Sequence, residues 1–375
     1  MNSVESVAKT ERERPTGWAE RLLGQLRNWA RNLLQITFLA DNYFVHLFKF
    51  LPLTAALYYL VLNRSFRREQ HATLLGRIQY MKECVQPRIT SSKLRRNIHR
   101  IEKGLIMRPR RPTFALDYID ETVDLFSTAT AVEDFSRQEL EWAGAVLDKY
   151  FSSVIEEGPI RGARTRFYQS WRQVGASDTV PYLHRDLPDP AISIDQLDAL
   201  AVRRRSVRWF KSEPVPDDLL NRAIEVATNT PSACNRQPYT FFVVNSVSDA
   251  PTIAGLAMGT SGYAHNIPCL IVVVGNLSAY AHERDRHLIY IDSSLAAMQL
   301  MLALETQGLS TCPINWPDIA SRDRAMQKAL SLAAYEKPIM LIAVGYADPM
   351  GGIAYSQKKP IDLVRREVTV QQTMP

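Results

Sequence analysis

The residues "DSSLAAMQLMLALETQG", 292–308, constrain the fold most, because they are apolar on almost every side of a helix. Such a helix is stable only when it is covered on all sides, in a core or in an oligomer interface. Gly308 is predicted to be its C′ residue. Three β-branched runs bounded by turn residues, 240–246, 269–275 and 338–347, predict strands. The C-terminal half therefore combines strands with a buried helix.

The N-terminal half has a helical pattern. Apolar residues recur every three or four positions in 137–156, and 17–36 has a similar stripe with arginines opposite, which suits a surface helix, a partner groove or a membrane interface. Residues 175–191 are rich in proline, aspartate and glycine and predict a linker. The 375 residues have room for about two domains. We therefore predict a helical, basic N-terminal region over 1–190 and a second domain over 192–367.

The segment 44–63 is the most apolar part of the N-terminal half. Its uncharged centre runs for twelve residues from Leu51 to Leu62, and His46 and Lys49 precede it. A membrane-spanning helix needs about 20 apolar residues, whereas runs of about 10–14 are more often buried or interfacial. We predict an interfacial or packed helix rather than a spanning one, and the sequence leaves open whether it touches lipid.

The chain is basic, with a formal charge of +6 and a pI near 9.1, and the charge is concentrated in 64–111. That segment has fourteen lysines and arginines against three acids. A solvated helical face would explain this run. The alternative is a docking surface for an anion, with lipid headgroups or a phosphorylated substrate ahead of nucleic acid. A nucleic-acid partner is not predicted, because aromatic residues are not interleaved with the charges.

The four cysteines are far apart and form no pattern with zinc-ligand spacing. No metal site is predicted, and a reducing compartment is the simpler inference. The chain begins with "MNSVESVAKTERERP", which is charged and predicts no secretory signal. We therefore expect a cytoplasmic protein, peripheral to a membrane if it contacts one at all.

Polar clusters interrupt the apolar runs of the C-terminal half. The stretch "RRRSVRWF", 203–210, offers guanidinium groups and a hydroxyl suited to a phosphate or a carbonyl-rich ring. In "PSACNRQP", 231–238, the amides of Asn235 and Gln237 can both donate and accept hydrogen bonds. The stretch "STCPINWP", 310–317, predicts a tight loop, and "SQKKP", 356–360, adds two lysines.

These residues resemble the nitroreductase family of FMN-dependent oxidoreductases over roughly 195–365. The matching pieces, in family order, are Arg204-Arg205-Ser206-Val207-Arg208, Pro231 to Pro238, Gly308-Leu309, Gly345-Tyr346 and Lys358-Lys359. Each piece alone is a weak signal, but their order over one segment is specific. The resemblance implies an α+β fold, a mixed sheet flanked by helices, here preceded by a mostly helical region.

The resemblance also implies a homodimer with FMN at the interface and NADH or NADPH as electron donor. The donor and a small acceptor would use one pocket in turn, by a ping-pong mechanism, so no side chain is predicted to be catalytic. Asn235 and its loop would come from the partner subunit, which would explain why the loop is so polar. The implied cofactor-binding residues are Arg204, Arg205, Ser206, Arg208, Pro231, Ser232, Asn235, Gln237, Pro313, Ile314, Asn315, Lys358 and Lys359.

The chain departs from the family pattern in two places. Asn315 and Trp316 stand where many relatives have small or acidic residues, so Trp316 could stack on substrate or fill the acceptor site. Tyr263 is a second candidate substrate contact. Ordinary nitroreductases have no counterpart of the N-terminal half, which favours a dedicated biosynthetic substrate. Two hypotheses follow: an FMN-dependent oxidoreductase, or a catalytically degenerate scaffold of the same fold at a membrane-associated assembly.

Overall fold

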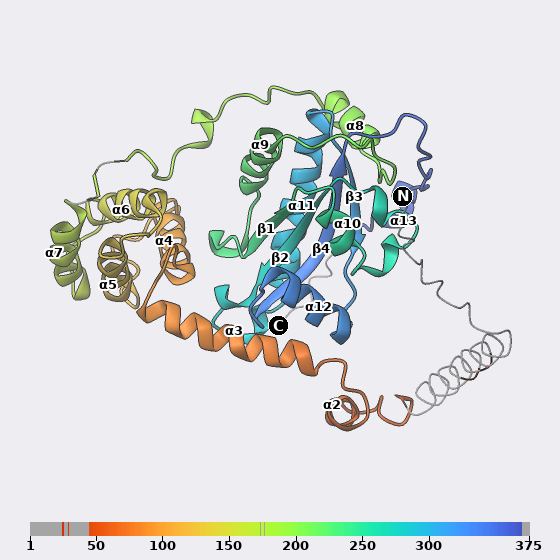
Figure 1. Ribbon diagram of the computed structural model, residues 1–375. Helices are drawn as coiled ribbons and strands as arrows, with labels where there is room; N and C mark the ends of the chain where they lie inside the picture. Colours follow the sequence, from red (N-terminus) through yellow and green to blue (C-terminus); the bar gives the residue numbers. More distant parts are fainter. Residues whose placement is uncertain (1–24, 26–28, 30–44, 173, 176, 370–375) are drawn as a thin grey trace, which may run out of the picture. The chain divides into compact units, whose positions relative to one another are not determined.

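The computed structural model describes residues 25, 29, 45–172, 174–175 and 177–369 (Figure 1). The chain divides into two compact units with the boundary between Arg67 and Arg68. In the first unit the structure describes helix α2 (Pro52–Val61), which begins at a proline. The helix predicted within 17–36 lies outside the described residues, apart from two positions. All the other elements named below belong to the second unit, except that helix α3 begins at Arg67.

A four-stranded antiparallel sheet forms the centre of the C-terminal half, in the order β1-β2-β4-β3. Its strands are β1 (Tyr239–Val244), β2 (Cys269–Asn276), β3 (Ser310–Asn315) and β4 (Glu336–Gly345). The three predicted strands are present, and the α+β fold class is confirmed. The parallel part of the expected mixed sheet is a single bridge from Ser206 to Thr311.

Strand β3 corrects the prediction of a tight loop over 310–317. Ser310 pairs with Gly345 and Pro313 pairs with Ile342, so this stretch is an edge strand. A proline has no N–H to donate to a ladder and is tolerated at an edge, where one side of the strand has no neighbour. The prediction was wrong because Pro313 and Cys312 interrupt the β-branched pattern by which the other strands were found.

Helices cover both faces of the sheet (Figure 1). Alternate residues of β2 point to opposite faces, as the two-residue period of a strand requires. Ile271 and Val273 pack with α9 (Asp217–Thr228) and α11 (Leu288–Thr306), whereas Leu270 and Val272 pack with α10 (Asp249–Ala254) and α12 (Ala320–Leu330). Helix α8 (Ile194–Arg203) also contacts α11. The sheet is therefore the middle layer of three.

Helix α11 is the buried helix predicted over 292–308. Ala297, Leu300 and Leu304 are fully buried against the sheet. Gly308 has φ +79°, the left-handed conformation predicted for a C′ residue. Among the described residues, Glu283–Thr306 is the stretch long and apolar enough to cross a membrane. Because it packs on the sheet, we assign it to the protein core.

Four helices upstream form a hydrophobic core of their own. They are α4 (Ser92–Leu105), α5 (Ile119–Thr130), α6 (Arg137–Phe151) and α7 (Pro159–Trp171). We call residues 92–171 the helical region. The Ser91 hydroxyl accepts a hydrogen bond from the Leu94 amide at 3.2 Å and caps α4. The core is aromatic: the Phe167 ring centroid lies 5.4 Å from that of Phe151 and 5.7 Å from that of Trp171.

Helix α3 (Arg67–Val85) packs on the sheet domain rather than on the helical region's core. Ala72 shares a hydrophobic cluster with Leu277 and Ile289. A Cβ on Gly76 would lie 2.7 Å from the Leu277 Cβ, so a glycine is needed for this close approach. Helix α3 lies N-terminal to the predicted boundary at 190 and yet packs on the sheet domain, so the boundary itself stays a prediction.

Five of the fourteen lysines and arginines in the basic segment 64–111 form ion pairs within the described residues. Arg68 contacts Asp318 at 3.1 Å, Arg77 contacts Glu283 at 2.8 Å, and Lys93 pairs with Glu121. Because acids pair with these three side chains, they form neither a solvated basic face nor an anion-docking surface. Within the described residues, Lys103, Arg108, Arg110 and Arg111 form no ion pair. The docking hypothesis therefore remains open for these and the other basic side chains of 64–111 that form no ion pair within the described residues.

The remaining short helices are η1 (His184–Asp186), η2 (Ala233–Asn235), η3 (Met258–Thr260), η4 (Ala264–Asn266), η5 (Leu277–Ala279), η6 (Glu283–Asp285) and α13 (Ile361–Val364).

Candidate functional site

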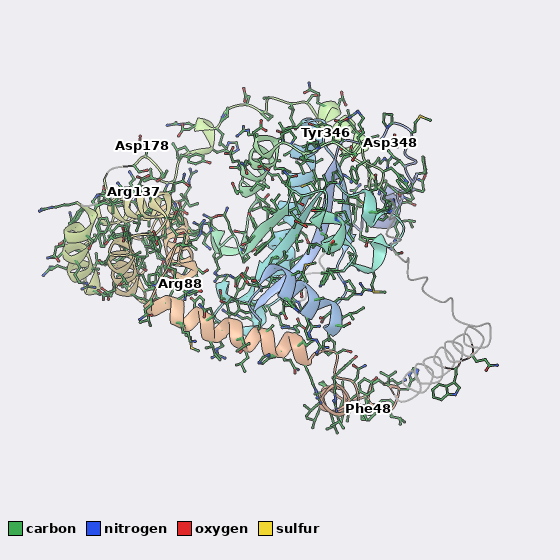
Figure 2. The ribbon with its side chains drawn as sticks, in the orientation of Figure 1. Phe48, Arg88, Arg137, Asp178, Tyr346 and Asp348 are labelled. Carbon is green, nitrogen blue, oxygen red and sulfur yellow. The ribbon has the colours of Figure 1, made fainter. Side chains whose placement is uncertain are left out.

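The arginine-rich stretch after α8 is fixed along the end of the sheet where β3 begins. The Val207 amide donates to the Thr311 carbonyl at 3.0 Å, and the Lys211 amide donates to the Tyr346 carbonyl at 2.8 Å. Figure 2 labels Tyr346 on the stretch that follows β4. Arg204, at the end of α8, already has an extended backbone. The predicted cofactor residues of this stretch are therefore held on a rigid edge.

The side chains around the start of β3 form a cluster that includes a tyrosine and a thiol. The Arg208 guanidinium lies 5.9 Å from the centroid of the Tyr263 ring, and the Tyr263 hydroxyl lies 3.9 Å from the Cys312 Sγ. Burial raises the pKa of Tyr263 to about 12. Burial also raises the pKa of the Cys312 thiol, and the hydrogen bond to Tyr263 and the charge of Arg208 offset that second rise in part. Both groups therefore stay protonated at neutral pH, and Cys312 is not a ready nucleophile.

Two polar atoms of this cluster are buried without a hydrogen-bond partner within the described residues. They are the Nε of Arg204 and the Oγ1 of Thr311. A buried polar group left unpaired costs about 1–3 kcal/mol, so such atoms are usually satisfied by protein, water or ligand. Phosphate or ring carbonyl oxygens would suit the guanidinium. The residues present therefore fit a phosphorylated, carbonyl-bearing ligand such as FMN.

The second cluster is the loop 231–238, which includes η2. Cys234, Asn235 and Gln237 have φ of 53°, 51° and 49°, in the left-handed region that non-glycine residues seldom adopt. The Gln237 amide nitrogen of the backbone donates to the Ser232 Oγ at 3.0 Å. The Ala233 amide donates to the Asp292 Oδ2 at 3.0 Å. The side chains of Ser232 and Asp292 therefore accept hydrogen bonds that hold the loop backbone in this conformation.

The two predicted amide ligands differ in what they contact. The side-chain amide of Gln237 donates to the Thr228 carbonyl at 2.9 Å and accepts from Arg95 at 3.1 Å. The Asn235 side chain makes no hydrogen bond within the described residues. Asn235 is therefore free to meet a ligand, whereas Gln237 is engaged in holding the loop. That either residue binds a cofactor stays a prediction.

One copy of the chain does not bring the two clusters together. Strands β1 and β3 are the two edges of the sheet. Tyr239, where β1 begins, pairs with Gly275 at the far end of β2, whereas Ser310, where β3 begins, pairs with Gly345 at the end of β4. Because neighbouring strands are antiparallel, the loop before Tyr239 and the arginine-rich stretch beside the start of β3 lie at opposite edges and opposite ends of the sheet. Within one copy of the chain the two clusters therefore lie apart on the sheet.

Along β3 the predicted residues alternate between exposed and buried. Pro313 and Asn315 are exposed, and Ile314 is buried. Trp316 is also buried, and its indole donates to the Asp323 Oδ1 at 2.6 Å. Asp323 in turn lies 2.7 Å from the Lys337 Nζ. Trp316, predicted to face substrate, is thus a packing residue in this structure, and a contact with substrate stays a prediction.

The C-terminal lysines lie in an exposed segment without regular structure. Lys358 and Lys359 form no ion pair within the described residues. A hydrogen bond of 3.4 Å from Arg205 Nη1 to the Tyr355 carbonyl links this segment to the arginine-rich stretch. Binding of FMN by Arg205, Lys358, Lys359, Pro231 or Ser232 stays a prediction.

Sequence reasoning missed two residues that hold the loop 231–238, namely Arg95 on α4 and Asp292 on α11. Arg95 lay unrecognised in a basic run, since nothing local distinguishes it from its neighbours. Asp292 is an acid within an otherwise apolar helix. Such an acid, which must be paired when buried, was the one usable signal.

Comparison with known proteins identifies the family of the C-terminal half. The family model described as "Nitroreductase family" matches residues 201–261 and 254–346. An NADH dehydrogenase of Thermus thermophilus is 30% identical over 179 residues, which are 39% of this chain and 84% of that protein. The chain belongs to the nitroreductase family. At this coarse level it is an oxidoreductase.

Two further similarities each cover somewhat less than half of the chain. Human iodotyrosine deiodinase 1 is 25% identical over 215 residues, 49% of this chain and 73% of that protein. The solved structure of an FMN-dependent nitroreductase from Clostridium difficile is 20% identical, with a TM-score of 0.37, and covers 42% of this chain and 91% of that one. The helical region lies outside the residues that the family model matches.

Proposed function

We propose that this nitroreductase-family chain is an FMN-dependent oxidoreductase that works as a homodimer and takes electrons from NADH or NADPH. The observation that carries the proposal is the pair of buried, unpartnered polar atoms, Arg204 Nε and Thr311 Oγ1, beside Arg208. The opposite placement of the two clusters supports a site shared between two copies. FMN, when bound, supplies reversible hydride acceptance.

The protein's own residues bind and orient. Arg204 and Arg208 would provide fixed positive charge for the phosphate or the polar edge of the ring, and Ser206 a hydroxyl. Asn235 of a second copy would present an amide that both donates and accepts. Cys312 stays a neutral thiol under the Tyr263 hydroxyl and takes no part in electron transfer. No side chain is assigned a proton-transfer role.

The test is a titration of cofactor-free protein with FMN, followed by anaerobic addition of NADH or NADPH. We expect a yellow protein that bleaches with at least one donor. Arg204→Met should weaken FMN binding by roughly tenfold or more, the value of a charge-assisted hydrogen bond. Arg222→Met is the matched control, because Arg222 is an exposed arginine of the same domain that pairs with Glu225. Wild-type protein that stays colourless in FMN would defeat the proposal.

The acceptor is proposed to be a small aromatic molecule, in keeping with the iodotyrosine deiodinase relatives. Iodotyrosine and a simple nitroaromatic are therefore the first acceptors to supply to the reduced protein. A catalytically degenerate scaffold is the second candidate. We favour turnover, because the buried Trp316 donates a hydrogen bond to Asp323 and so does not fill the acceptor site along the exposed side of β3. FMN that binds but is reduced by neither donor would support the scaffold instead.

We also propose that the protein is cytoplasmic and touches a membrane surface through α2. Leu53, Leu57 and Leu60 recur at helical spacing and are 79%, 51% and 61% exposed. An apolar stripe of this length lies in the interface rather than across the bilayer. The double variant Leu53→Asp with Leu60→Asp should lose sedimentation with phosphatidylserine-containing vesicles, and Ser65→Asp should keep it. Wild-type protein that stays in the supernatant would contradict this proposal.

A further inference from the structure

Arg95 on α4 joins the helical region to the loop 231–238. Its Nε donates to the Asn235 carbonyl at 2.8 Å, and its Nη2 donates to the Gln237 Oε1 at 3.1 Å. The side chain is only 16% exposed. The guanidinium therefore donates hydrogen bonds to both the backbone and a side chain of the loop.

The other side of the same guanidinium is fixed by the helical region. Its Nη1 lies 3.1 Å from the Glu139 Oε2 on α6, and the Trp142 ring centroid lies 5.3 Å from the guanidinium carbon. The Glu139 side chain is 2% exposed, and its Oε1 accepts from the Ser91 amide at 3.0 Å. The Thr90 hydroxyl also donates to Glu139. Arg95 is therefore oriented before it meets the loop.

The loop needs such support because of its backbone. A non-glycine residue in the left-handed region is strained, and the loop has three of them, at 234, 235 and 237. Such conformations persist where surrounding contacts enforce them. Ser232 and Asp292 supply contacts from the sheet domain itself. The bonds to the Asn235 carbonyl and the Gln237 Oε1 come from Arg95 alone among the described residues.

We propose that Arg95 is a positioning residue of the flavin site. It transmits the rigidity of the helical region to the loop 231–238, so that the free amide of Asn235 is presented to the cofactor of a second copy. Arg95 itself does not contact the cofactor. This inference rests on the proposed function. By this inference the helical region contributes to the oxidoreductase site by fixing the loop, although the region lies outside the residues that the family model matches.

The experiment compares Arg95→Met and Arg95→Lys with a control on the same helix, Arg100→Met. Arg100 stacks on Tyr118 and lies 3.5 Å from Asp117, away from the loop. We expect Arg95→Met to raise the FMN dissociation constant roughly tenfold, as the loss of charge-assisted hydrogen bonds would. Arg95→Lys should fall between, because an ammonium group lacks the planar fork that reaches both acceptors. Arg100→Met should bind FMN as the wild type does.

Hydrogen exchange of the cofactor-free protein separates positioning from simple destabilisation. In Arg95→Met, the backbone amides of residues 233–237 and of Tyr239 should exchange faster while those of α5 and α7 keep their protection. Wild-type FMN affinity together with wild-type loop exchange in Arg95→Met would overturn the inference. If Arg95→Met does not fold, Arg95→Lys decides by the same two measurements. If the wild type binds no FMN, the proposed function fails, while the exchange rates still report whether Arg95 holds the loop.

A double-mutant cycle makes the assignment specific to one bond. Gln237→Leu removes the acceptor that Arg95 Nη2 reaches. Residues coupled through a direct contact have non-additive effects. We therefore expect Gln237→Leu to weaken FMN binding less in the Arg95→Met background than in the wild type. Fully additive effects would contradict a positioning role through this bond.

Discussion

The helical region and the sheet domain differ in how they use buried charge. Within the described residues the sheet domain buries Asp292, Glu305, Asp323 and Lys337, whereas the helical region buries Glu139 as its one charged side chain. Burying a charge is costly unless it is paired, so each buried charge indicates a specific partner. The partner of Glu139 is Arg95, which reaches the loop of the sheet domain. The helical region therefore has a largely apolar core and one buried acid, Glu139, whose partner Arg95 forms hydrogen bonds with the candidate site.

The strongest test of this comparison is Phe167→Ala in the helical region. Phe167 is fully buried among Phe126, Phe151 and Trp171. Removing its ring should lower the free energy of unfolding by about 3–5 kcal/mol, because it leaves a cavity in an aromatic core. Denaturant unfolding measures the loss. Phe167→Leu is the matched variant and should cost less, because it keeps most of the volume.

Hydrogen exchange shows where the Phe167→Ala effect is felt. We expect α5 and α7 to lose protection, because both helices line this core. The amides of β2 and β4, in a separate core, should keep theirs. Equal loss of protection in both regions would break the comparison and show that the two cores unfold as one unit.

The sequence predicted what depends on local patterns and missed what depends on distant contacts. Three strands and the helix ending at Gly308 were predicted because period, burial and turn residues agree there. Strand β3 was missed because Pro313 is a residue typical of loops, although a proline is also tolerated in an edge strand. The arginine cluster was found as a motif. The role of Arg95 was not, because its partners, Asn235 and Gln237, lie about 140 residues further along the chain.

A smaller effect is expected for Gly308→Ala at the end of α11. Gly308 has φ +79°, and no heavy atom lies within 4 Å of a Cβ built there, so the substitution tests backbone strain alone. The left-handed conformation should cost alanine roughly 1–2 kcal/mol of unfolding free energy. Gly308→Asn should cost less, because asparagine tolerates this region. Thermal unfolding of the two variants checks the order, and a harmless alanine would contradict it.

The smallest expected effect sharpens the contrast in buried charge through pH. The Asp292 Oδ2 accepts from the Ala233 amide at 3.0 Å and from the Tyr280 hydroxyl at 3.2 Å. Burial raises the pKa of Asp292 above 3.8, and these two hydrogen bonds offset the rise only in part. The folded state therefore keeps the proton at pH values where the unfolded chain has already lost it.

Above pH 3.8 the folded protein consequently binds more protons than the unfolded chain, and its free energy of unfolding falls as pH rises through the raised pKa. Asp292→Asn cannot ionise and keeps an amide oxygen that can accept one of the two hydrogen bonds. The stability of Asp292→Asn relative to the wild type should therefore increase with pH over this window and then level off. Urea unfolding of both proteins at several pH values measures the difference. A difference that stays constant with pH would mean that ionisation of Asp292 costs the folded loop nothing, and that this buried acid is as well solvated as an exposed one.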